Sequence, residues 1–424
     1  MNTTTRRDFL STASLAAGGL LLSREFAGAQ PPPRRLRRNI RTIEANDPDY
    51  LLRFRRAFAQ LHTTQGDDGF QAIAGYHGVP GEFCHNEPIL FLAWHRAYLL
   101  RLEDALRKLD GTLALPFWNW TDSESEMTGI PKAYAELMFD DGGQQKPNPL
   151  ASGPISPIGP SARTQRAPRP ANQLDGFREV VSSAQMATSY AGLNNGLSGP
   201  HGSVHVWVGG HMGAVDYAAY DPIFWAHHAT VDRQWAEWQS GPKNRNPNAA
   251  TLQMRLEPFN KTVAEVVDFR TTLNYEYEGL SPLAAGGQLV KAGPLANFPE
   301  FAPAAPVSGP FLFVRGMKPS ERSIVVHVFI EQPGATLETA AVGGGNLAGM
   351  FGIFGHKKKA AGAAGHGHGD VNGDAIAVLN LGPIVKRLKE KGIAAKSVKL
   401  VAADLDGKEI AVGDLPFEEF FVGQ

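Results

Sequence analysis

Histidine is unevenly distributed along this chain, and its spacing limits how the chain can fold. Five of the thirteen histidines fall between residues 199 and 232. His201 and His205 stand at i and i+4, so on an α-helix both rings project from one face, about 6 Å apart at Cβ. His227 and His228 are adjacent and point about 100° apart on a helix, so at most one of them is expected to face the same point. The pattern predicts two helices that meet around the first pair and His228, with His227 beside the site.

A second group of histidines lies in the first half of the chain, at His77, His85 and His95. The last two are about 280° apart around a helix, so they cannot share one helical face. His85 is therefore expected in the loop before a helix that carries His95. Two sets of three imidazoles on four helices and a loop predict a dinuclear metal site inside a helical bundle. The remaining histidines of the second half are predicted not to bind these metals: His211, His327, His356, His366 and His368.

The residue types around the histidines narrow the choice of metal. Di-iron bundles use Glu and Glu-x-x-His ligands, which these motifs lack, and calcium and magnesium prefer oxygen ligands. An all-imidazole set favours copper or zinc, with copper preferred by the affinity order. A zinc peptidase would carry Glu directly after the first histidine of the i, i+4 pair as general base, but Gly202 occupies that position. A dizinc hydrolase is therefore the weaker alternative.

The predicted fold class is mainly α, a four-helix-bundle dicopper domain followed by a small C-terminal β-sandwich. Apolar periodicity and capping residues predict helices over 46–64, 86–111 and 221–239, and a short one over 200–208. A proline-rich stretch predicts a long surface loop over 146–170. Further along the chain, a stretch rich in Gly, Ala and His predicts a flexible loop over 343–369. Alternating and β-branched runs predict strands around 310–316, 323–331, 374–382, 397–406 and 408–414.

The predicted division of the chain is a signal peptide over 1–29, the helical domain over 39–291, a Pro/Ala-rich linker over 292–310, and the sandwich over 311–424. Arg6 and Arg7 precede an Ala/Gly/Leu-rich stretch and an Ala-x-Ala cleavage site. This order is typical of a twin-arginine export signal, which places the mature protein in the periplasm or outside the cell. The apolar stretch is too short to span a bilayer. The basic run at 34–38 is expected to be a mobile arm after the signal.

Charge and cysteine content exclude some partners and bonds. Lys plus Arg number 41 against 42 Asp plus Glu, which gives a formal net charge of -1 and no support for a nucleic-acid partner. Cys84 is the one cysteine of the chain, so an intrachain disulfide is impossible.

The motifs FLAWHRAYLLRLE and PHGSVHVWVGG…DPIFWAHHATVDRQWAEWQ resemble the two copper motifs of tyrosinases and catechol oxidases, the type-3 copper proteins. The resemblance covers roughly residues 45–240, and the segment from 311 is similar to the C-terminal domain of plant polyphenol oxidases. It implies two copper ions that use O2 to oxidise o-diphenols to o-quinones. It also implies a first copper on His77, His85 and His95 and a second copper on His201, His205 and His228.

Departures from the family pattern concern the first site and the monophenol step. His85 and His95 are ten positions apart where most members have nine, with His62 as a remote alternative ligand. Many relatives link a nearby cysteine to this histidine through a thioether, but Cys84 is directly adjacent to His85, a difficult geometry for the bridge. Members that hydroxylate monophenols often carry Asn where this chain has Gly202, together with an upstream Glu. We therefore expect oxidation of o-diphenols, or o-aminophenols, to dominate over that of monophenols.

Asp232, one turn after His228, and Asn119 are expected to orient ligands, with helix packing or a turn as the alternative explanation of each. The resemblance implies that Gly202, Met212 and Val215 line the substrate entrance. The C-terminal domain is expected to cover the copper site, so that cleavage within 292–310 raises activity. Expected partners are O2, a small phenolic substrate and a copper-delivery protein, with no nucleic acid and no membrane span. A haemocyanin-like O2-binding protein is the alternative from another functional class.

Overall fold

The structure is a computed structural model that describes residues 34–84, 87–241, 246–280, 309–318, 320–355 and 376–423. The predicted signal peptide, nearly all of the linker and four histidines lie outside these residues: His85, His356, His366 and His368. The described residues from Arg35 onward belong to one compact unit. No helix among the described residues is long and apolar enough to cross a membrane. The predicted division into signal, helical domain, linker and sandwich stays a prediction.

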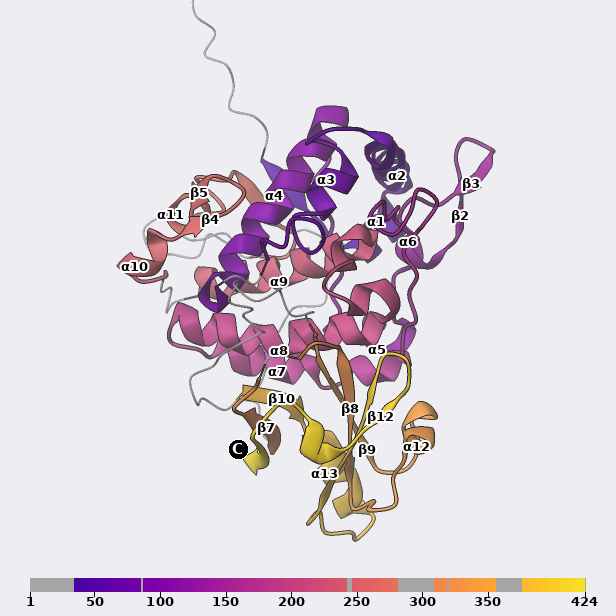
Figure 1. Cartoon of the computed structure of the whole chain (residues 1–424), viewed down its shortest axis with the longest axis vertical. Helices are drawn as coiled ribbons and strands as arrows, with labels where there is room; N and C mark the ends of the chain where they lie inside the picture. Colours follow the sequence, from indigo (N-terminus) through magenta and orange to yellow (C-terminus); the bar gives the residue numbers. More distant parts are fainter. Residues whose placement is uncertain are drawn as a thin grey trace, which may run out of the picture. The chain divides into compact units, whose positions relative to one another are not determined.

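Long helices make up the first part of the described chain (Figure 1). Three of them confirm the predicted helices: α2 (Pro48–Thr63), α4 (Phe91–Leu109) and α9 (Pro222–Ser240). The Asp47 and Asp221 side chains cap α2 and α9 by accepting from backbone N–H groups of the first turn, and a proline follows each of them. Together with α8, which carries the i, i+4 pair, they form the predicted bundle, in which α4 contacts α2, α8 and α9.

The helix α8 (Tyr190–Val208) is longer than predicted. It was expected to begin at Pro200, because proline favours the first turn of a helix. Instead it begins at Tyr190, capped by the Ser189 side chain, and Pro200 lies inside it. It ends at Gly209, whose φ of 65° suits glycine at a helix end, as the sequence indicated.

Short helices and 3-10 turns complete the helical part and the loops. They are α1 (Ile40–Asn46), α3 (Phe70–Ala74), η1 (Pro88–Leu90), α5 (Ser123–Thr128), α6 (Lys132–Ala135), η2 (Ala171–Leu174), α7 (Phe177–Gln185), η3 (Gly210–Gly213), η4 (Ala218–Tyr220), α10 (Ala249–Leu252), α11 (Val263–Val266), α12 (Leu337–Ala341), α13 (Gly382–Glu390) and η5 (Val412–Asp414). Two small hairpins, β2–β3 (Met138–Asp140 and Gln145–Pro147) and β4–β5 (Arg255–Leu256 and Lys261–Thr262), extend the loops.

The basic run at 34–38 is not the mobile arm that was expected. Arg35–Arg37 form β1, which pairs in parallel with β6 (Tyr275–Tyr277), a strand near the end of the helical part in sequence. Arg37 is fully buried, because acidic and aromatic partners from distant segments surround it. The local charge pattern does not reveal contacts between residues so distant in sequence, and by itself it is typical of a solvated arm.

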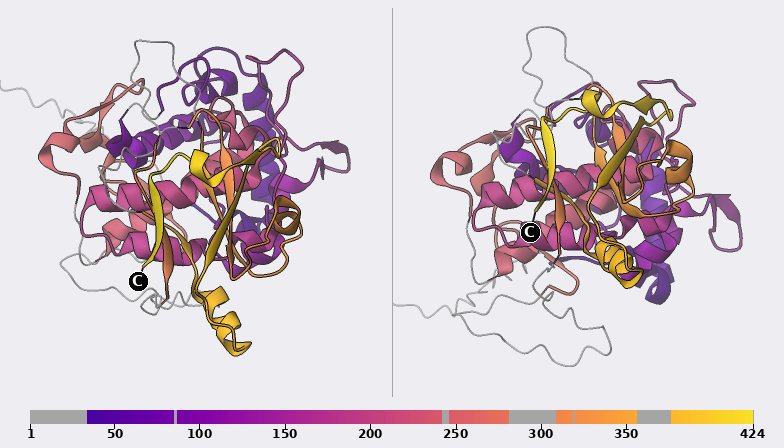
Figure 2. Two further views of the ribbon diagram at one scale, coloured as in Figure 1. Left: turned by 60° about the horizontal axis from the view of Figure 1, so that its bottom comes forward. Right: turned by 90° about the horizontal axis from the view of Figure 1, so that it is seen from below.

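The C-terminal part consists of two antiparallel sheets (Figures 1 and 2). One has the order β10-β7-β13 and the other β12-β11-β8-β9. One apolar core draws side chains from both sheets, as in a sandwich. The strands are β7 (Phe311–Arg315), β8 (Ile324–Ile330), β9 (Leu347–Ile353), β10 (Ile376–Asn380), β11 (Val398–Asp404), β12 (Glu409–Ile410) and β13 (Glu419–Gly423).

One predicted loop is wrong in part. The stretch 343–369 contains the strand β9, which pairs with β8 along most of its length. Its glycines suggested a loop, but the Gly352 position requires a residue without a side chain, since an added Cβ would lie 2.7 Å from Cβ of Val206 on α8. The glycine therefore marks a close approach between the strand and the helix.

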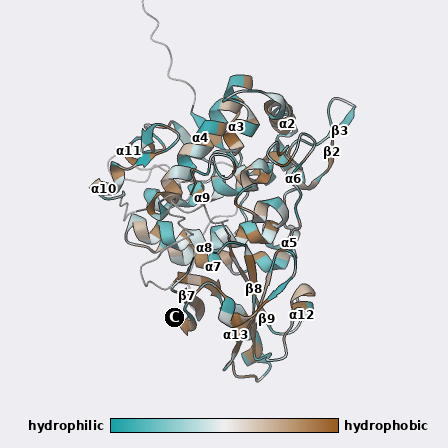
Figure 3. Ribbon diagram, viewed as in Figure 1, coloured by the Kyte–Doolittle hydropathy of each residue, from teal (hydrophilic) through white to brown (hydrophobic). Residues whose placement is uncertain are grey.

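The sheet β12-β11-β8-β9 is covered on both faces. Every residue of β8 is buried, and Figure 3 shows β8 among the most hydrophobic elements. Because side chains alternate along a strand, Val326 and Val328 face the other sheet while Val325 joins the core of the helical part. The C-terminal strands lie across α7 and α8 (Figure 2), and β9 packs against α8.

Candidate metal centre

Three imidazoles meet where α8 packs on α9. The Nε2 atom of His228 on α9 lies 3.3 Å from Nε2 of His201 and 3.2 Å from Nε2 of His205, both on α8. All three rings are fully buried. Metal–imidazole bonds of about 2.0 Å in tetrahedral geometry put ligand nitrogens about 3.3 Å apart, so this spacing fits a single metal ion. The structure thus brings together the trio that the sequence predicted.

A second group shares the same core. The ligand atoms of His77, His95 and His228 all lie within 4.8 Å of one another. His77 follows α3, and His95 lies on α4 with its ring stacked on that of His228 at a centroid distance of 4.1 Å. His228 therefore lies between the two groups.

The third predicted ligand of the first site is outside the described residues. His85 follows Cys84 directly, and the Cys84 sulfur lies 3.5 Å from Nε2 of His95. The chain therefore reaches the first site immediately before His85. His85 as a ligand stays a prediction, and so does the expectation that its position next to Cys84 disfavours a thioether bridge. His62, the alternative, packs between Phe58 and Phe70 and is not part of either histidine group.

Backbone carbonyls orient three of the rings. Nδ1–H of His205 donates to the Met212 carbonyl at 2.9 Å, and that of His77 donates to the Val215 carbonyl at 3.2 Å. The Nδ1–H of His95 donates to the carbonyl one turn earlier, at Phe91. Each bond fixes the tautomer that leaves the Nε2 lone pair for a metal. Met212 and Val215 were predicted at the substrate entrance, and the structure adds that their main chain orients the ligands.

Burial keeps the imidazoles of His95 and His228 neutral, the form that binds a metal. It lowers the pKa of His95 to about 3. Burial, followed by the neighbouring His95 and His201, also holds the pKa of His228 well below its usual value. Protons therefore compete weakly with a metal at these nitrogens near neutral pH.

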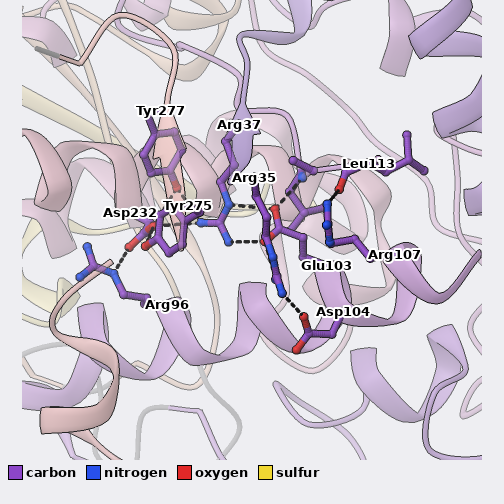
Figure 4. A network of polar contacts seen from close by, with 12 residues as sticks. Arg35, Arg37, Arg96, Glu103, Asp104, Arg107, Leu113, Asp232, Tyr275 and Tyr277 are labelled. Carbon is purple, nitrogen blue, oxygen red and sulfur yellow. Dashed lines mark hydrogen bonds and ion pairs between the residues drawn. The ribbon is translucent and has the colours of Figure 1, made fainter. Parts of the chain in front are cut away.

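A buried ion-pair network locks the two helices that carry His95 and His228 (Figure 4). Arg37 of β1 lies between Glu103 of α4 and Asp232 of α9, with contacts of 3.0 Å to both. Arg96, next to His95, also donates to Asp232 at 2.5 Å. Burial raises the pKa of Asp232, but Arg96 and Arg37 outweigh it, so the net shift is downward.

The second carboxylate oxygen of Asp232 also accepts from the hydroxyls of Tyr275 and Tyr277, at 2.6 and 2.7 Å. Asp232 was expected to orient a ligand, and it lies one helical turn after His228. Its contacts fix the relative position of α4 and α9, so its influence on the histidines passes through the helices. The sequence analysis missed Arg37 and the two tyrosines, because they are more than two hundred residues apart in the sequence although they meet in the fold.

Two other predicted roles have local explanations. The Asn119 side chain accepts from the Thr121 hydroxyl, and its carbonyl accepts from Ser125, which are contacts of a turn. The His211 ring accepts from the Gln165 backbone, and His211 belongs to neither histidine group found among the described residues.

The C-terminal part places an aromatic ring directly on the metal site. Phe354 follows β9, and its ring stacks on His205 at a centroid distance of 4.2 Å and an interplanar angle of 12°. It is 4% exposed. A Cβ added at Gly202 would lie 3.4 Å from Cβ of Phe354, so a longer side chain there would meet this residue. The ring thus covers the α8 face of the site beside Gly202.

Hydrogen bonds join the segment around Phe354 to the helical part. The Ser203 hydroxyl, between the two histidines of α8, accepts from the backbone N–H of Gly352 at 2.9 Å. The Ser323 hydroxyl donates to the carbonyl of Gly213 and accepts from the N–H of Gly355. Residues on both sides of Phe354 are therefore anchored to the loop and helix that hold the ligands.

Comparison with known proteins agrees with this geometry. Residues 56–241 match the common central domain of tyrosinase. The chain is 29% identical over 290 residues to hemocyanin 1 of Megathura crenulata; the match covers 58% of this chain and 8% of that protein, so it spans a small part of the relative. In fold it is similar to a functional unit of octopus hemocyanin (TM-score 0.63, 21% identity, 92% of this chain and 99% of that one). An Aspergillus oryzae pro-tyrosinase has a TM-score of 0.65 at 18% identity over 90% of this chain and 92% of the other.

Buried histidine groups on facing helices, within a tyrosinase central domain, define a dinuclear copper protein. The chain is similar to type-3 copper proteins, the family of tyrosinases and haemocyanins, through the central domain that it shares with them. Both groups in the described part of the chain consist of histidine alone, a donor set that fits copper. The resemblance of the C-terminal part to that of plant polyphenol oxidases stays a prediction.

Proposed function

We propose that this protein oxidises o-diphenols with O2 to o-quinones, accepts o-aminophenols as well, and acts weakly on monophenols. The observation that carries the proposal is the pair of buried all-histidine groups joined at His228. Two bound copper ions supply the two-electron redox chemistry with O2. In the overall reaction, two diphenols lose two electrons and two protons each, and one O2 becomes two waters.

The protein's own residues orient the copper ligands and limit access of solvent to the site. The carbonyls of Met212 and Val215 keep the rings of His205 and His77 in one tautomer. Phe354 excludes water and bulky solutes from the face of His205. We propose that the C-terminal part restrains turnover until it is displaced or the linker 292–310 is cleaved. Export by the twin-arginine route is proposed from the signal sequence.

The second candidate is an O2-binding protein without turnover. It is favoured by the 29% identity to a hemocyanin and by the cover over His205. Oxygen uptake with catechol, before and after linker cleavage, distinguishes the two. Consumption after cleavage supports the oxidase, and reversible O2 binding without consumption in both forms supports the carrier.

Removal of a single ligand tests the metal centre itself. In His205→Ala, we expect the copper content to fall from two ions per chain toward one and catechol oxidation to fall below about one-hundredth of wild type. His211→Ala is the matched control, since its ring binds the Gln165 backbone outside both groups. Metal analysis and an oxygen electrode give the two readouts. Equal copper content in both variants contradicts the assignment.

The weak monophenol activity has its own test. Proton abstraction from a phenol needs a base in direct reach or one water away. Gly202 offers no side chain for this, and Phe354 limits what can replace it. We expect cleaved enzyme to oxidise catechol readily but to hydroxylate tyrosine slowly and after a lag. Fast hydroxylation without a lag or added reductant contradicts this expectation.

A further inference from the structure

A fourth imidazole lies within reach of the copper site on α8 and α9. His227 is fully buried, and its ligand atom lies within 4.8 Å of those of His201, His205 and His228. Its ring is parallel to that of His201, with 5.2 Å between centroids and 10° between planes, and nearly perpendicular to that of His205. The sequence placed His227 beside the site, whereas the structure places it among the ligands.

The polar atoms of this ring are poorly satisfied. In the described part of the chain, neither ring nitrogen of His227 has a hydrogen bond of normal geometry. A neutral imidazole carries a lone pair on one of its two ring nitrogens, and this lone pair can bind a metal. Buried polar atoms without partners are rare in native proteins and require an explanation.

We propose that His227 is a reserve ligand of this copper site, which takes the place of His201 when that bond opens. The inference rests on the copper assignment made above. His201 is the expected exchange partner because the two rings are stacked in the same orientation. His205, in contrast, is held in place by its bond to the Met212 carbonyl.

The exchange is chemically balanced. One bond from copper to the His201 nitrogen breaks, and one bond to a His227 nitrogen forms. A neutral imidazole replaces a neutral imidazole, so no electron is transferred. Such a reserve would keep the metal bound during the opening of a site that is covered from one side by Phe354.

Copper content of full-length variants tests the proposal without any activity measurement. Wild type, His227→Leu, His201→Ala and the double variant are loaded with copper(I) under anaerobic conditions, freed of excess metal and analysed for copper. We expect two ions per chain in the first three proteins and one in the double variant. Leucine is close to histidine in volume and removes both ring nitrogens. One copper in His201→Ala alone overturns the proposal.

Wild type with fewer than two coppers would contradict the dicopper assignment itself, so the two failures are distinguishable. If circular dichroism shows that His201→Ala does not fold, copper release from wild type and His227→Leu to a copper(I) chelator replaces the comparison. We expect the second copper to leave His227→Leu about tenfold faster, the size of effect typical of residues that support a metal site. Equal release rates overturn the proposal.

Discussion

Phe354→Ala is expected to raise the rate of catechol oxidation by about 10- to 100-fold in the uncleaved protein. The ring stacks on His205, so its removal opens that face of the site. A site that is accessible in only 1–10% of molecules gains about this factor when the accessible state becomes dominant. Initial rates at several catechol concentrations measure the effect.

A matched control separates opening of the site from general loosening. Phe329 is fully buried in the neighbouring strand β8, in a cluster with Ala335 and Ala340 that includes no residue of the two histidine groups. Phe329→Ala should lower stability by about 3–5 kcal/mol, as large-to-small core changes do, without a comparable gain in rate. Cleavage within 292–310 should add little to Phe354→Ala. An unchanged rate in Phe354→Ala contradicts the shielding role.

The second large effect is expected at Arg37. Replacement by methionine leaves the carboxylates of Glu103 and Asp232 buried without their shared cation. Loss of one partner from a buried ion pair costs about 3–5 kcal/mol, so Arg37→Met should unfold at markedly lower denaturant concentration. Because these carboxylates join α4 to α9, the variant should also lose copper more readily. Denaturant unfolding and metal analysis after dialysis measure the two effects.

The pH dependence of the stability lost in Arg37→Met follows from the direction of the pKa shifts of the two carboxyl groups. Burial raises the pKa values of Glu103 and Asp232, but their arginine partners outweigh it and hold both values below normal. A carboxyl with a lowered folded-state pKa stabilises the fold above its unfolded pKa and loses this contribution as the pH falls through the folded value. The difference in stability between wild type and Arg37→Met should therefore be largest near neutral pH and shrink in acid.

An ion pair on the outside of the same helix provides the control. Arg101 of α4 pairs with Asp68, and both side chains are partly exposed. Arg101→Met should cost less than about 1 kcal/mol, because solvent screens the pair. Similar costs for Arg37→Met and Arg101→Met would contradict the role of the buried network.

Much of the bundle was predictable because its signals are local. Asp47 and Asp221 followed by proline marked the starts of α2 and α9, and Gly209 marked the end of α8. The start of α8 was not predictable from Pro200, since proline is tolerated inside a helix when tertiary packing compensates for the missing hydrogen bond. The strand β9 was missed because glycine usually indicates a loop, whereas here Gly352 is required by the close contact with α8.

The sequence by itself determined which histidines share a helical face and which metal an all-imidazole set favours, since residue type and i, i+4 spacing are local properties. Only the tertiary structure decided that His228 lies between the two groups and that His227 lies among the ligands. It also decided which carbonyls orient the rings, that Arg37 ties α4 to α9, and that Phe354 covers His205. These contacts join residues distant in the chain, and side-chain periodicity carries no information about which distant faces pack together.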